Sequence, residues 1–93
     1  VITFICILTV CAEILAFDYG KLIHSHIIEV GLHLDVYIGN ALVDMYGKCG
    51  NTIMVQELFD EMMVRNIVSW NGLLSVYVRR EEYKLIKEDK MKM

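Results

Sequence analysis

The sequence contains no proline, and no segment shows the strict polar and apolar alternation or the paired turn residues of a β-sheet domain. It is also poor in basic residues. Residues 1–78 carry three Lys or Arg against eight Asp or Glu, a balance of 3 − 8 = −5. A domain that holds nucleic acid by bulk charge is normally basic. These absences exclude a β-sheet domain and a binder that relies on electrostatic attraction alone.

Patterns typical of catalysis and metal binding are missing as well. Cys6, Cys11 and Cys49 form no CxxC pair, and their odd number is not typical of a secreted disulfide framework. His24 and His26 are two residues apart, so on a helix they point in directions about 160° apart and make no chelating pair. No Ser/His/Asp set, recognisable carboxylate pair or phosphate-binding glycine loop is present. We therefore expect no enzyme, no metal site and no cofactor.

Apolar residues are abundant, at 56% of the chain with a mean hydropathy of +0.45. The longest apolar stretch, VITFICILTVCAEILAF, has Glu13 as its only charge. It has no flanking Lys or Arg, and its uncharged part is shorter than the roughly 20 residues that span a bilayer. We expect this stretch to be a buried helix rather than a membrane segment. A short chain this apolar is expected to need packed neighbours.

An internal repeat is the strongest pattern. Residues 36–48, VYIGNALVDMYGK, return 31 positions later (67 − 36) as IVSWNGLLSVYVR. The shift pairs Val36 with Ile67, Asn40 with Asn71, Leu42 with Leu73, Val43 with Leu74, Tyr46 with Tyr77 and Lys48 with Arg79. A fainter copy lies 35 positions upstream (36 − 1). Because a period of about 20–50 residues is typical of solenoids, the repeat predicts stacked units.

Each copy has the apolar period of two short helices. In the middle copy one stripe ends at Gly50 and another follows Asn51, residues that suit a helix C-terminus and an N-cap. The first copy predicts helices at residues 2–14 and 19–30. In the third, Ser69 is the expected N-cap of a helix that carries Trp70 into the core. A partner helix or an atypical ending is expected in residues 80–93. The prediction is an all-α fold, an α-solenoid of antiparallel helical hairpins with about two and a half repeats.

Three sequence segments resemble, in order and spacing, the pentatricopeptide-repeat (PPR) proteins of land plants: GKLIHSHIIEVGLHLDVYIGNALVDMYGKCG, LFDEM and RNIVSWN. The unequal periods are similar to the PLS-type subclass, which alternates long and short repeats. The resemblance implies a long repeat at 1–35, a short repeat at 36–66 and an incomplete third repeat with an atypical charged tail at 67–93. Tetratricopeptide repeats keep a period of about 34 residues and a signature that this chain lacks. We expect the chain to be a fragment or truncated product.

The resemblance implies binding of single-stranded RNA, one base per repeat, read by the fifth and last residues of the repeat. In the short repeat these are Asn40 and Asn66, and the base is expected between Tyr37 and Val68. An Asn side chain offers one acceptor and two donors, and a Tyr face adds stacking worth about 1–3 kcal/mol. The family pattern implies that this pair reads a pyrimidine, C or U.

The neighbouring repeats are less complete. Asp35 is the last residue of the long repeat, but its fifth residue, Ile5, is apolar, so this repeat is expected to act as a spacer. Asn71 is the fifth residue of the third repeat and the expected reader of the next base.

The resemblance also implies a place in a mitochondrion or chloroplast and a part in RNA editing or another processing step, with editing or processing factors supplied in trans. It implies no membrane and no small-molecule substrate. Two alternatives stay open. The net charge of −3 and the apolar ends favour a protein-interaction scaffold, and the short length and aberrant tail favour a non-functional remnant.

Overall fold

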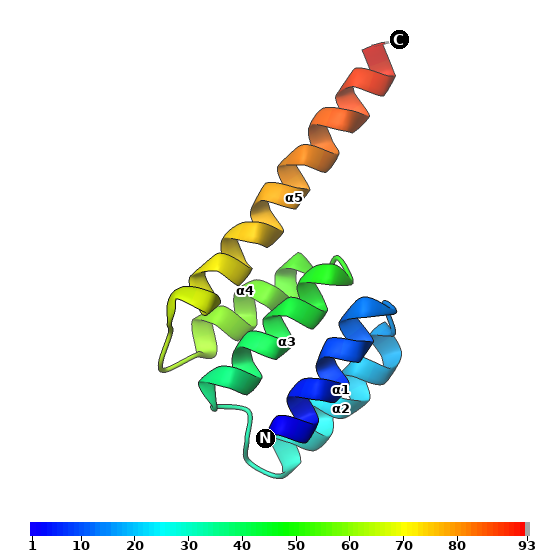
Figure 1. Ribbon diagram of the computed structural model, residues 1–93. Helices are drawn as coiled ribbons and strands as arrows, with labels where there is room; N and C mark the ends of the chain where they lie inside the picture. The colour runs from blue at the N-terminus through cyan, green and yellow to red at the C-terminus, as the bar shows by residue number, and fades with distance from the viewer. Residues whose placement is uncertain (93) are drawn as a thin grey trace.

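The computed structural model describes residues 1–92, with side chains described for residues 1–82, 84 and 85. Over these residues the chain forms α1 (Ile2–Glu13), α2 (Phe17–Glu29), α3 (Val36–Lys48), α4 (Thr52–Glu61) and α5 (Ile67–Lys92). Figure 1 shows α1 and α2 as one hairpin and α3 and α4 as the next, while α5 packs beside them and extends beyond. The predicted all-α solenoid of helical hairpins is confirmed.

Helix α3 lies at the centre and contacts each of the other four helices. Its apolar stripe is fully enclosed, because Ile38, Leu42 and Met45 are 0% exposed and Tyr46 is 2% exposed. These residues recur at the i, i+4, i+7 and i+8 spacing predicted from the sequence. Burying each such side chain contributes about 1.5–3 kcal/mol. The shared core is therefore built around the buried side chains of α3.

Helix α1 is buried on one side only. Leu8, Cys11 and Ala12 face the core, whereas Ile2 and Val10 are largely exposed. A hollow of about 470 Å³ lies beside α1 and the start of α2, lined by Cys6, Ile7, Val10, Cys11, Ile14, Ala16 and Tyr19. The expectation of a buried helix holds for one face of α1. Within residues 1–92, none of the helices combines the length and apolar character that a bilayer crossing requires.

The first three helices end in the same way. The second residue beyond each helix adopts a positive φ: 55° at Leu15, 78° at Gly31 and 83° at Gly50. The following N–H then returns to the last turn, as in Ala16 N to Cys11 O (2.9 Å), Leu32 N to Ile27 O (3.1 Å) and Asn51 N to Tyr46 O (3.0 Å). This pattern is the Schellman motif, in which glycine is favoured. Leu15 is therefore the strained member of the set.

Helix α5 lacks this stop. The position that corresponds to Gly50 is Glu81 (50 + 31), and no Gly or Pro follows Gly72 in the sequence. Without a residue that accepts a positive φ, the helix continues to Lys92. Of the two alternatives expected for residues 80–93, the separate partner helix is wrong for the described part of the chain. Those residues extend α5 instead.

The start of α5 also differs from the prediction. Asn66 is the residue before the helix, and Ser69, the expected N-cap, lies in the first turn and is 0% exposed. Trp70 was expected in the core, but it is 49% exposed and meets Phe59 edge-on at 4.8 Å between ring centroids. The reason is that α5 packs only on α3 and α4, so its remaining sides lack a neighbour among the described residues.

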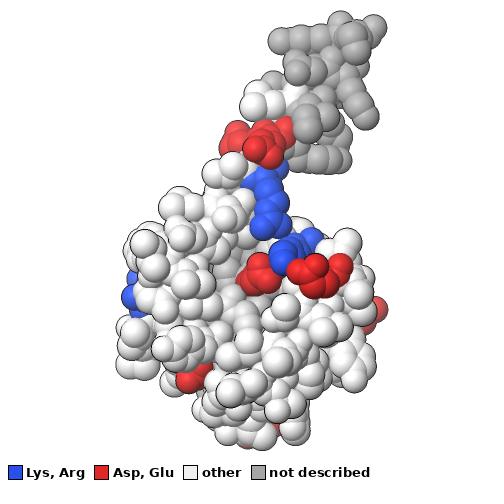
Figure 2. Space-filling model, viewed as in Figure 1, with Lys and Arg blue, Asp and Glu red and all other residues white. Residues whose placement is uncertain are grey.

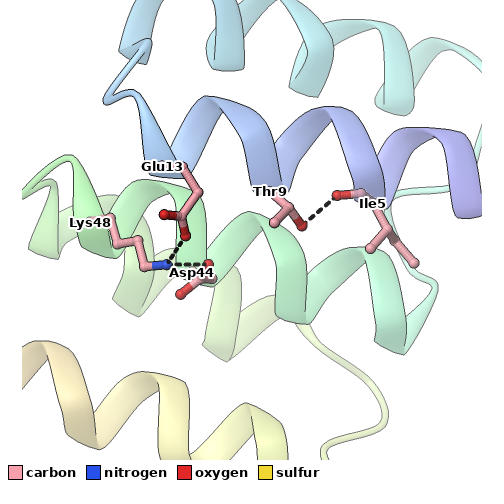
Figure 3. Close-up of polar contacts among 5 residues, drawn as sticks. All are labelled: Ile5, Thr9, Glu13, Asp44 and Lys48. Carbon is pink, nitrogen blue, oxygen red and sulfur yellow. Dashed lines mark hydrogen bonds and ion pairs between the residues drawn. The ribbon is translucent and has the colours of Figure 1, made fainter.

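An ion-pair bridge links the two hairpins (Figure 3). Lys48 Nζ lies 3.1 Å from Glu13 Oε1 on α1 and 3.4 Å from Asp44 Oδ2 on its own helix. The hydrogen bond to Glu13, followed by the charge of Asp44, raises the pKa of Lys48. Because these groups are solvated, the bridge is expected to contribute little to stability.

A Leu15→Gly substitution is expected to raise the free energy of unfolding by about 1 kcal/mol, because glycine accepts the left-handed conformation without a Cβ clash. Leu15 is 61% exposed, so little packing is lost. Urea unfolding followed by circular dichroism measures the change. Gly50→Ala, at the equivalent turn, is the matched control and should lower stability. A less stable Leu15→Gly variant would contradict the assignment of strain.

The His24 and Tyr46 pair predicts a pH dependence of stability. His24 Nδ1 lies 2.8 Å from the Tyr46 hydroxyl. Burial lowers the pKa of His24, the charge of Glu61 opposes this by raising it, and His33 lowers it further. Since the folded pKa is the lower one, the unfolded chain binds the proton more readily. Stability should therefore fall as pH drops through about 6.5 and level off below the folded pKa.

Urea unfolding at about pH 7.5 and about pH 5 tests this pH dependence. His24→Gln should reduce the loss of stability at the lower pH. His26→Gln is the matched control, because that side chain is 59% exposed and should leave the loss unchanged. Equal losses in the wild type and His24→Gln would show that another group is responsible.

Candidate nucleic-acid interface

A pocket of about 300 Å³ opens where α1, α3 and the start of α5 meet. Its lining consists of Ile5 and Thr9 from α1, Tyr37, Asn40 and Ala41 from α3, and Asn66 and Val68 at the start of α5. Four of the predicted site residues are thus brought together from two segments of the chain. Ile5, the apolar fifth residue of the upstream copy, forms part of the same wall.

The two predicted base-reading amides touch one another. Asn40 Nδ2 donates to Asn66 Oδ1 at 3.0 Å, across 26 positions of sequence. Both side chains are half-buried, so each is held by the protein and still reaches the pocket. A fixed pair of amides at the edge of a neutral pocket can recognise a planar group through directional hydrogen bonds.

Ser69 completes this polar cluster, whereas sequence reasoning named it only as an N-cap and missed its place beside the two amides. The Ser69 hydroxyl donates to Asn40 Oδ1 at 2.5 Å and accepts from the backbone N–H of Asn66 at 3.2 Å. The backbone N–H of Ser69 donates to Asn66 Oδ1 at 3.0 Å. Asn66 is therefore the N-cap of α5, and Ser69 is its partner three residues on. The sequence feature that could have indicated this contact is a polar residue, Ser69, three positions after a possible N-cap, Asn66, which is the spacing of a capping box.

Tyr37 and Val68 occupy the second positions of α3 and α5 and lie at the mouth of the pocket. Tyr37 is 63% exposed and Val68 is 55% exposed. Both line the pocket next to the amides. An exposed aromatic ring beside polar groups is the arrangement that stacks a nucleic-acid base.

The other two predicted residues lie elsewhere. Asp35 is the N-cap of α3, and its Oδ1 accepts from the backbone N–H groups of Tyr37 (2.9 Å) and Ile38 (3.0 Å). Asn71 is exposed on α5 and lines a separate hollow of about 520 Å³ with Leu74, Ser75, Val78, Arg79 and Glu82. The structure therefore groups Tyr37, Asn40, Asn66 and Val68 in one pocket, and Asp35 and Asn71 are outside its lining.

Charge contributes little to this pocket. None of its lining residues is charged. Figure 2 shows a face that is mostly free of charged side chains, with charges gathered near the place where α5 leaves the body. Across the described residues no group of three His, Cys, Asp or Glu is arranged to hold a metal ion. The chemistry that the pocket offers is directional hydrogen bonding and stacking.

Comparison with known proteins adds sequence relatives. Residues 40–67 match the family described as the PPR repeat. A pentatricopeptide repeat-containing protein of Arabidopsis thaliana, named as chloroplastic/mitochondrial, is 42% identical over 81 residues, which is 87% of this chain and 13% of the relative. Another from the same plant, CRR2, named as chloroplastic, is 43% identical over 82% of this chain and 12% of its own length. The chain thus spans about an eighth of the length of these relatives.

Proposed function

Because this chain is a pentatricopeptide-repeat protein, we propose that it binds single-stranded RNA and reads one base in the pocket between α1, α3 and the start of α5. The observation that carries this proposal is the hydrogen bond between Asn40 and Asn66, which places two amides from distant positions at one site. A base would present its edge to these amides. Its two faces would lie against Tyr37 and Val68.

The hydrogen-bonding groups of the pocket support a pyrimidine in this proposal. The pocket is neutral, and amide N–H groups match the carbonyl groups of cytosine and uracil. Stacking on Tyr37 would add affinity for any base. We therefore assign C or U to the Asn40 and Asn66 pair.

Adjacent repeats would extend the site along the chain. In this proposal the long repeat is 1–35, the short repeat is 36–66 and the third begins at 67, as in the PLS-type subclass. Asn71 would read the next base from its own hollow on α5. Asp35 would close the long repeat, whose fifth residue, Ile5, offers no hydrogen bond and acts as a spacer.

We propose a mitochondrial or chloroplast setting and a part in editing or another RNA processing step. The support is that named relatives are chloroplastic or chloroplastic/mitochondrial pentatricopeptide repeat-containing proteins. The chain would select a position on the RNA, and factors supplied in trans would act there. The apolar hollow beside α1 favours a protein-interaction scaffold as the second candidate function.

Asn40→Ala is expected to reduce the preference for pyrimidine over guanine by about threefold to tenfold, the net worth of one hydrogen bond. Titrating the ¹⁵N-labelled chain with short C, U, A and G oligoribonucleotides, followed by nuclear magnetic resonance, measures even weak binding.

Ser25→Ala is the control, since Ser25 is exposed on α2 outside the pocket and should leave this preference intact. Failure of the wild-type chain to shift with any oligonucleotide, together with binding of a protein partner at the apolar hollow, would favour the scaffold.

Tyr37→Ala is expected to weaken binding of every oligonucleotide by about tenfold, because stacking does not depend on base identity. The ratio between bases should change little. Tyr19→Ala provides the control, since Tyr19 is similarly exposed, at 60%, but lies on α2 away from the pocket. Unchanged affinity in Tyr37→Ala would remove the ring from the site.

A further inference from the structure

We propose that Ser69 is a specificity-determining positioning residue, which orients the Asn40 and Asn66 amides so that they offer N–H donors to the base. This inference rests on the proposed RNA-binding function and adds a residue to it. Ser69 does not line the pocket and is 0% exposed, so it acts through the two amides.

The orientation of Asn66 follows from the backbone. The N–H of Ser69 lies 3.0 Å from one terminal atom of the Asn66 amide. A backbone N–H only donates, so that atom is the oxygen. The nitrogen of the same amide, with its two N–H groups, is then the end left for a ligand in the pocket.

The orientation of Asn40 follows in turn. Its terminal atom 3.0 Å from Asn66 Oδ1 faces an acceptor and is therefore the nitrogen. Its oxygen faces the Ser69 hydroxyl at 2.5 Å. That hydroxyl accepts from the Asn66 N–H at 3.2 Å and has one proton to donate. Two amide oxygens are within reach, Asn66 Oδ1 at 3.1 Å and Asn40 Oδ1 at 2.5 Å, and the shorter distance assigns the proton to Asn40.

With these orientations, the Asn40 and Asn66 amides offer N–H donors, rather than oxygen acceptors, to a ligand in the pocket. Asn66 Oδ1 receives two N–H groups, from Ser69 and Asn40, which occupies both of its lone pairs. Asn40 Oδ1 is turned toward a fully buried residue. The N–H groups left over can meet the acceptors of a pyrimidine edge, O2 with N3 of cytosine or the carbonyl oxygens of uracil. They oppose the N1–H and N2–H donors of guanine.

This arrangement is particular to the boundary at residue 66. The position that corresponds to Ser69 one repeat earlier is Ile38 (69 − 31), which is apolar and 0% exposed. Asp35 there caps two backbone N–H groups, and no side-chain hydroxyl joins it. Ser69 therefore serves one base position rather than the fold of every repeat.

Ser69→Ala in the 93-residue chain tests this role. The substitution keeps the backbone N–H that holds Asn66 and removes only the hydroxyl that holds Asn40 Oδ1, so the Asn40 amide can turn and offer its oxygen to guanine. The expected result is a change of about threefold to tenfold in the ratio of guanine to pyrimidine dissociation constants, toward guanine. Titration of the ¹⁵N-labelled chain with C, U, A and G oligoribonucleotides gives the ratio. Ser25→Ala, at an exposed serine on α2, should leave it unchanged.

An unchanged ratio in a Ser69→Ala variant with wild-type helicity would overturn the inference. If that variant does not fold, Ser69→Cys retains the shape with a weaker donor, and it should shift the ratio in the same direction. In the wild type without RNA, one Asn40 side-chain amide proton should exchange slowly, and its absence would also overturn the inference. A wild-type chain that binds no oligonucleotide refutes the proposed function itself, whereas failure of the inference shows only in the variants or in this amide signal.

Discussion

The buried stripe of α3 is the constraint on which the rest of the structure depends. Its side chains contact α1 and α2 on one side and α4 and α5 on the other, so the positions of the two hairpins are set through this one helix. The same helix begins with Tyr37 and Asn40 on the side away from the core. Because α1 and α5 both pack on α3, residues from both segments line the pocket beside these side chains. The site is therefore a consequence of packing that buries Ile38 and Leu42.

Turn chemistry decides where this packing stops. Gly31 and Gly50 allow the chain to reverse after α2 and α3, and Leu15 makes the same turn at a conformational cost. At the third equivalent position Glu81 removes the reversal, and α5 continues. The result is a helix whose first turns pack on α3 and α4 and whose later turns lie beyond the body (Figure 1). Glycine at this register position favours the reversal, Leu15 makes it with strain, and at Glu81 the helix continues.

Features that depend on local sequence could be predicted, whereas features that depend on tertiary packing could not. The stripe of α3 was predictable because the period of 3.6 residues depends only on local sequence. The missing turn at Glu81 was also readable from the repeat register. Ser69 and Trp70 were mispredicted because their environments depend on tertiary packing: either Asn66 or Ser69 suits an N-cap, and burial of Trp70 needs a neighbour on the outer side of α5. The contact between Asn40 and Asn66 was implied only by the family resemblance, and its hydrogen bonds required the fold.

At residues 35 and 66 the proposed recognition would use side chains that also cap a helix. Asp35 and Asn66 both precede a helix and both use a side-chain oxygen to cap its first N–H groups. N-caps are restricted mainly to Asn, Asp, Ser, Thr and Gly, because a short polar side chain must reach the backbone. Four of these side chains can also form hydrogen bonds with a base edge. In Asn66 the capping oxygen faces the helix, so the nitrogen is the group left for the pocket. The physical requirement for starting α5 therefore also determines which hydrogen-bonding group this position offers to a ligand.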